Sequence, residues 1–103
     1  MLTEQEQNII IEKLKPFEPT RLAWSPFNVI LNPNKLAILY DFNKTPDYIE
    51  FLAAIEDIQN QIHQPLDFTG FEFIPNNTKN EILASSTLFF SGIRDQEAGI
   101  SSN

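Results

Sequence analysis

Residues 36–40, with the sequence LAILY, form an apolar run without the alternation of a half-exposed strand. Such a run is typical of a strand that is covered on both faces of its sheet. A second apolar run lies at residues 21–24, and the bridge between the two contains Pro26 and the turn-forming sequence NPN at residues 32–34. We therefore expect strands at 21–24 and 35–42, the second of them at the centre of a small sheet.

Helical patterns lie on either side of these strands. The sequence TEQE, starting at Thr3, has the form of a capping box and predicts a helix over residues 4–15. Thr45 as N-cap and Pro46 at the first helical position predict a longer helix over residues 46–63. Its apolar residues recur at spacings of three and four, as a core-facing stripe requires: Tyr48, Phe51, Leu52, Ile55, Ile58 and Ile62.

The later part of the chain contains weaker signals. Residues 66–73 alternate between apolar and polar side chains, which predicts a half-buried strand that bends at Gly70. A short helix over residues 78–84 is expected next. The sequence LFF at residues 88–90 is either an edge strand or the end of that helix.

This order of elements predicts one α/β (α+β) domain over residues 1–90, with helices packed on a small mixed sheet. The polar residues 91–103 are expected to form a flexible tail. For residues 25–34 the sequence is compatible with a short helix and equally with another strand. We expect these side chains to be largely buried: Ile11, Leu14, Leu36, Ile38, Leu52, Ile55 and Phe68.

Composition excludes several classes of function. A formal net charge of −7 opposes a nucleic-acid or anionic-membrane surface. The absence of Cys excludes thiolate chemistry, and a single His leaves little for a zinc site. No stretch approaches the roughly 20 apolar residues of a membrane span, and the acidic N-terminus is unlike a signal peptide. We expect a cytoplasmic protein without a membrane or nucleic-acid partner.

The order of the expected elements, together with several short sequence segments, resembles the minimal nucleotidyltransferase family. Its members are the small antitoxin-like partners of HEPN proteins in prokaryotic toxin–antitoxin pairs. The resemblance rests on IIEKLKPFEPTR at residues 10–21, on a strand, bridge and strand ending in YDF at 40–42, and on LDF at 66–68. It covers about residues 9–90. It implies a nucleotidyltransferase fold and a protein partner of the HEPN type.

Catalysis in that family depends on a Gly-Ser pair after the first strand, where bare N–H groups and a hydroxyl hold the nucleotide phosphates. In this chain the Gly-Ser position falls near Pro26 and Phe27, directly after Ser25. Proline has no N–H to offer and phenylalanine has no hydroxyl. The phosphate cradle is therefore not expected here.

The second family motif is an Asp-x-Asp, with a third Asp on the next strand, which together bind Mg²⁺. Lys35 and Ala37 stand at the Asp-x-Asp positions, and Asp67 alone matches, as the third carboxylate. Lys35 could pair with Asp67 in place of a metal, or both could simply face solvent. We expect no catalytic residue, no metal and no cofactor; Mg²⁺ and ATP would be needed only if a rearranged site works.

Two functional classes stay open. The first is a catalytically inactive pseudoenzyme that acts as a protein-interaction module, with a HEPN-type toxin or as a homo-oligomer. The alternative is an active or nucleotide-binding minimal nucleotidyltransferase with a rearranged site. Large apolar residues outside the helical stripes favour the first class, and the expected interface contains these: Trp24, Phe27, Phe89 and Phe90. If residues 88–90 form an edge strand, a second copy could pair with it.

Overall fold

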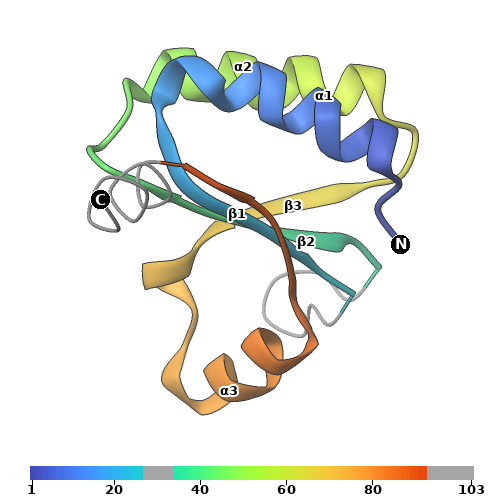
Figure 1. Ribbon diagram of the computed structural model, residues 1–103, viewed down its shortest axis with the longest axis vertical. Coiled ribbons are helices and arrows are strands. Elements are labelled where there is room, and N and C mark those ends of the chain that lie inside the picture. The colour runs from blue at the N-terminus through green and yellow to red at the C-terminus, as the bar shows by residue number, and fades with distance from the viewer. Residues whose placement is uncertain (27–33, 93–103) are drawn as a thin grey trace, which may run out of the picture.

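The structure is a computed structural model that describes residues 1–26 and 34–92. Figure 1 shows α1 and α2 together on one side of a sheet and α3 on the other. The elements follow in this order: α1 (Glu4–Leu14), the 3₁₀ helix η1 (Lys15–Phe17), β1 (Pro19–Ser25), β2 (Leu36–Phe42), α2 (Tyr48–Gln61), β3 (Leu66–Gly70), the 3₁₀ helix η2 (Phe71–Phe73), α3 (Asn76–Ser85) and β4 (Thr87–Ser91). The predicted α/β class is confirmed.

The four strands lie in the order β3-β2-β1-β4. β1 is antiparallel to both of its neighbours, and β2 is parallel to β3, so the sheet is mixed as predicted. β2 is buried on both faces. Leu36 and Ile38 belong to the core under α1 and α2, whereas Ala37 and Leu39 belong to the core under α3.

The capping box at the start of α1 is confirmed. The Oγ1 of Thr3 accepts a hydrogen bond from the N–H of Glu6 at 3.1 Å, and Glu6 Oε1 accepts one from the N–H of Thr3 at 2.9 Å. The helix ends at Leu14, one residue before the predicted end, and the chain tightens into η1, which contains a proline near its start. Proline lacks the N–H that a continuing α-helix needs.

The predicted start of α2 is wrong by two residues. Asp47, rather than Thr45, is the N-cap, and its Oδ1 accepts from the N–H of Glu50 at 3.0 Å. The predicted burial of Leu52 is also wrong, because this side chain is 44% exposed. The buried face of α2 is centred on Phe51 and Ile58, and Leu52 lies about 100° around the helix from Phe51, at the margin of that face.

The predicted strand over residues 66–73 is wrong beyond Gly70. There the chain turns into η2, closed by a hydrogen bond from the N–H of Ile74 to the carbonyl oxygen of Phe71 at 3.4 Å. The turn lets both Phe71 and Ile74 enter the core under α3, which strict alternation would not allow. η2 therefore replaces the second half of the strand.

The last strand settles the choice left open at residues 88–90. β4 is an edge strand beside β1, where Arg21 pairs with Ser91, and the N–H of Gly92 donates to the carbonyl oxygen of Thr20 at 2.9 Å. Strand pairing thus reaches one residue past the predicted domain boundary. The rest of the predicted tail, residues 93–103, and most of the 25–34 bridge lie outside the described residues.

Most of the predicted core is confirmed. Leu14, Leu36 and Ile38 are buried. Three further predicted core residues are partly buried and pack against the same cluster: Ile11, Ile55 and Phe68. In the part of the chain that the structure describes, no helix has the length and apolar character to cross a bilayer.

Candidate functional site

Three of the residues singled out from the sequence lie side by side across the sheet. Ser25 on β1 is the register partner of Ala37 on β2, and Ala37 is the partner of Asp67 on β3. Residues opposite each other on neighbouring strands point to the same face. The row lies at the amino ends of β2 and β3, where the resemblance places the catalytic motifs. We call these three residues the amino-end row.

Ser25 is held by α3. Its side chain is fully buried, and its Oγ lies 2.8 Å from the Oγ of Ser85. Ser85 Oγ also donates to the carbonyl oxygen of Ile82 at 3.1 Å, inside the same helix. The serine hydroxyl at this end therefore ties β1 to α3.

The middle of the amino-end row holds a methyl group. Ala37 is buried in a cluster with Ala23, Leu39 and Ile82, which α3 covers. Asp67 and Lys35 beside it are half-buried, and each has an interaction partner. Among the described residues, no group of three His, Cys, Asp or Glu side chains could hold a metal ion.

The other residues of the predicted site are only partly placed. Pro26 is exposed directly after β1, and Phe27 lies outside the described residues. Of the predicted interface, three residues are half-buried against the core under α1 and α2: Trp24, Phe89 and Phe90. Whether these side chains form an interface stays a prediction.

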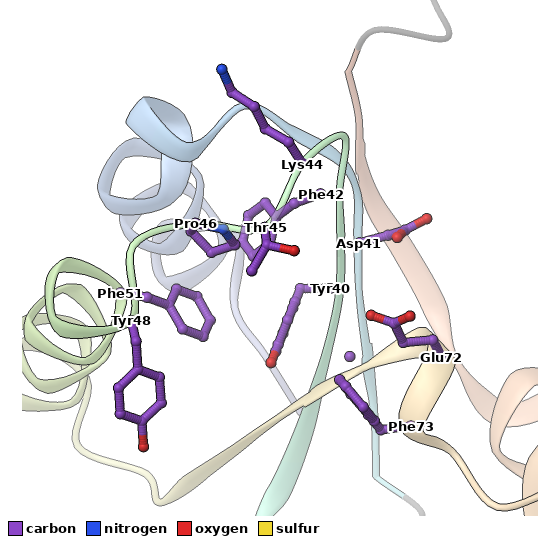
Figure 2. Close-up of a pocket in the computed structure, with 11 residues that line it drawn as sticks. Tyr40, Asp41, Phe42, Lys44, Thr45, Pro46, Tyr48, Phe51, Glu72 and Phe73 are labelled. Carbon is purple, nitrogen blue, oxygen red and sulfur yellow. The ribbon is translucent and has the colours of Figure 1, made fainter.

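A second candidate site lies at the opposite ends of the same strands. A cavity of about 380 Å³ opens outside the carboxyl ends of β2 and β3. Figure 2 shows the side chains around it. They come from the end of β2, the connection to α2, the start of α2, the end of β3, and η2: Tyr40, Asp41, Phe42, Lys44, Thr45, Pro46, Tyr48, Phe51, Gly70, Glu72 and Phe73. We call it the carboxyl-end pocket.

Packed aromatic rings form one wall of this pocket. The ring centroid of Phe51 lies 5.1 Å from that of Tyr40, 5.5 Å from that of Phe42 and 5.9 Å from that of Phe17. These rings meet edge to face, which is a favourable arrangement for aromatic quadrupoles. The wall is therefore formed before any ligand arrives.

Gly70 brings the opposite side of the pocket close. A Cβ at this position would lie 3.1 Å from Cδ2 of Phe73 and 3.4 Å from Cε1 of Tyr40. The Phe73 ring thus lies over the bare backbone of Gly70, next to Tyr40. A larger residue at position 70 would push the Phe73 ring outward.

Charges of both signs line the pocket: Asp41, Lys44 and Glu72. Burial, and then the negative charge of Glu72, raise the pKa of Tyr40 above its ordinary value. Oδ2 of Asp41 lies 3.4 Å from Nε of Arg21 in an ion pair. Cζ of the Arg21 guanidinium also lies 3.9 Å from the centroid of the Phe71 ring. Figure 2 shows that the side chain of Lys44 extends away from the aromatic rings.

Only part of this pocket could be anticipated from the sequence. In open α/β sheets, ligands bind outside the carboxyl ends of parallel strands. That rule would have directed attention to Tyr40 and Gly70 once β2 and β3 were known to be parallel. The aromatic residues themselves come from three separate segments, which only the fold brings together.

No protein-family model and no curated protein matches the chain in sequence. Solved structures do match in fold. A structure of the toxin–antitoxin pair MntA–HepT aligns over 93% of this chain and 79% of the matched chain, with a TM-score of 0.64 and 11% identity. The complex of a tri-AMPylated HEPN toxin from Shewanella oneidensis with an MNT antitoxin aligns over 92% and 77%, also with a TM-score of 0.64 and 11% identity.

A toxin–antitoxin structure with AMP-PNP aligns over 89% of this chain and 78% of the matched chain, with a TM-score of 0.62 and 11% identity. At identities this low, the likeness concerns the fold. The chain has the nucleotidyltransferase fold of the MNT antitoxins, as the resemblance implied.

Proposed function

We propose that this chain is a cytoplasmic pseudoenzyme: a nucleotidyltransferase-fold protein that binds a HEPN-type protein and does not transfer nucleotides. The observation that supports it most is the amino-end row, where a buried methyl group stands in place of a carboxylate. The likeness in fold to antitoxins that are found in complexes with HEPN toxins supports the class of partner.

The residues of the amino-end row do not fit a magnesium–nucleotide complex. Mg²⁺ bound to a triphosphate needs hard oxygen ligands, and the row supplies one carboxylate, on Asp67. Lys35 adds a positive charge where the family has an acid. Ala37 is covered by α3 and offers no ligand atom.

Isothermal titration with ATP and with GTP in the presence of Mg²⁺ tests the inactive half of the proposal. We expect no binding in the micromolar range and no transfer of labelled nucleotide to a partner. The toxin–antitoxin pair solved with AMP-PNP is the positive control. Micromolar binding that Asp67→Asn abolishes would establish the alternative, a rearranged but working site.

Co-purification tests the partner half. We expect a small helical HEPN-type protein to be encoded beside this chain, and a tagged copy of the chain to retain it in a fixed ratio. Light scattering of the chain alone measures self-association at the same concentration. No complex with such a protein, together with a stable homodimer, would replace the HEPN partner by a second copy of the chain.

A further inference from the structure

Large apolar side chains stand exposed beside the carboxyl-end pocket. Tyr48 is 71% exposed, Ile49 is 77% exposed, and Phe73 is 69% exposed. Tyr48 and Phe73 line the pocket itself, and Leu52 continues the apolar strip one turn along α2 from Tyr48. Exposed apolar residues that lie next to one another mark a binding surface more often than isolated ones do.

The strip extends beyond what a small ligand in the pocket would cover. Ile49 and Leu52 are not among the lining residues, yet both are exposed on the same end of α2. The preformed wall of Tyr40, Phe42 and Phe51 suits one large apolar side chain entering from outside. A cavity with an apolar rim of this kind fits a segment of a protein.

The charged residues near the exposed apolar side chains indicate which charge that protein segment should carry. Glu72 lines the pocket beside Phe73, and Glu50 follows Ile49 on α2. Both glutamates are exposed, and neither has an ion-pair partner within the described ranges 1–26 and 34–92. Glu72 and Tyr40 line the same pocket, and the pKa of the Tyr40 phenol is raised first by burial and then by the negative charge of Glu72. A second copy of a chain with net charge −7 would bring acid against acid here.

We propose that the carboxyl-end surface, defined by Tyr48, Ile49, Leu52 and Phe73 with Glu50 and Glu72, docks a basic segment of a protein partner. That segment places one large apolar side chain in the pocket and Lys or Arg residues against the two glutamates. The inference rests on the proposed function for the identity of the partner as a HEPN-type protein. It adds that the partner binds at the end of the sheet opposite the amino-end row.

The first test measures the affinity of the neighbouring HEPN-type protein for variants of this surface by isothermal titration. Phe73→Ala and Glu72→Lys should each weaken binding by about tenfold or more, the size of an interface hot spot. The comparison variant is Leu88→Ala, because Leu88 is also exposed, at 55%, and lies on β4, at the other edge of the sheet from β3 and next to Phe89 and Phe90 of the interface expected from the sequence. Circular dichroism verifies that each variant is folded.

Unchanged affinity in both pocket variants, or an equal loss in Leu88→Ala, would overturn the inference while leaving the proposed function intact. A second probe covers the case in which the HEPN-type protein does not bind at all. It is a peptide with one Trp flanked by Lys residues, compared with the same peptide carrying Glu in place of Lys.

Amide chemical shifts of the labelled chain report where the peptide binds. The Lys peptide should change the amide chemical shifts of Tyr40, Tyr48, Gly70 and Phe73, and the Glu peptide should leave them unchanged. This result with no HEPN binding would refute the proposed function and support the docking surface. Shifts at β4 or the amino-end row instead, or none, would overturn the inference.

Discussion

The two ends of the parallel pair β2–β3 differ in the hollows that the described residues form beside them. Near the amino end, Pro26 and residues of α3 line a shallow surface hollow. At the amino end, Ser25 and Ala37 are buried, and α3 closes over them through the Ser25–Ser85 contact. At the carboxyl end, a cavity of about 380 Å³ stays open. The two ends of one parallel pair therefore differ in the space that they offer, and likeness in fold alone does not locate a binding site.

The largest loss of stability is expected from a charged side chain placed in the buried part of the amino-end row. Ala37→Asp would restore one family carboxylate, but in a buried apolar cluster and opposite Asp67. We expect the free energy of unfolding to fall by about 3–5 kcal/mol, as for an uncompensated buried charge. Urea unfolding measures it.

Ala53→Asp is the matched control, because the same change on an exposed face of α2 should cost less than about 1 kcal/mol. Equal losses in the two variants would show that the amino-end row is not buried as described.

At the carboxyl-end pocket, we expect the buried wall to contribute more to stability than the exposed rim. Phe51→Ala removes a buried ring that contacts Phe17, Tyr40 and Phe42, and should cost about 3–5 kcal/mol. Phe73→Ala removes an exposed ring and should change stability by less than about 1 kcal/mol. Thermal or urea unfolding separates them. If Phe73→Ala is as damaging as Phe51→Ala, the rim is part of the core and is not free to bind.

A smaller effect is expected from the hydroxyl pair at the amino end. Ser25→Ala removes the 2.8 Å contact with Ser85, whose Oγ retains the carbonyl oxygen of Ile82 as acceptor. The expected loss in unfolding free energy is about 0.5–1.5 kcal/mol. Ser86→Ala is the control, because the half-buried C-cap residue Ser86 donates its hydroxyl locally, to the carbonyl oxygen of Leu83 at 2.9 Å. A stabilising effect of Ser25→Ala would mean that the buried hydroxyl is not well satisfied.

The smallest effect should come from a region that belongs to neither end. Lys13 on α1 pairs with Asp57 on α2, and hydrogen bonds from Lys13 and then Gln61 lower the pKa of the Asp57 carboxyl below 3.8. A lowered pKa stabilises the folded state above the unfolded pKa, and this contribution disappears as pH falls through the folded pKa. Asp57→Asn should therefore be slightly destabilising at pH 7 and indistinguishable from the parent well below pH 3.8. A difference that persists at low pH would contradict the pairing.

Local signals in the sequence predicted the scaffold well. The capping box at Thr3 and Glu6 needs only four consecutive residues, so it could be read directly. At the start of α2, two neighbouring cap candidates compete, and Asp47 is placed to accept from Glu50 where Thr45 is not. When two neighbouring residues can each serve as the N-cap, propensities alone do not locate the helix end to the residue.

The errors inside the elements have a different origin. Leu52 has the spacing of a core residue, yet the buried face of α2 is centred on Phe51 and Ile58, and Leu52 lies about 100° around the helix from Phe51. The carboxyl-end pocket could not be predicted from periodicity, because Phe73 lies over Gly70 only after η2 turns the chain. Features made by the meeting of distant segments are those that sequence patterns miss.

The place of β4 has a consequence for how the chain folds. β1 can pair with β2 as soon as residue 42 is present, but its other edge is completed only by residues 87–91. Until that last strand arrives, the free N–H and C=O groups of β1 form a template that another unfinished chain could use. Sheet closure over such a sequence distance is slow. We therefore expect this protein to be most prone to aggregation during synthesis, and truncation before Thr87 to produce insoluble chains.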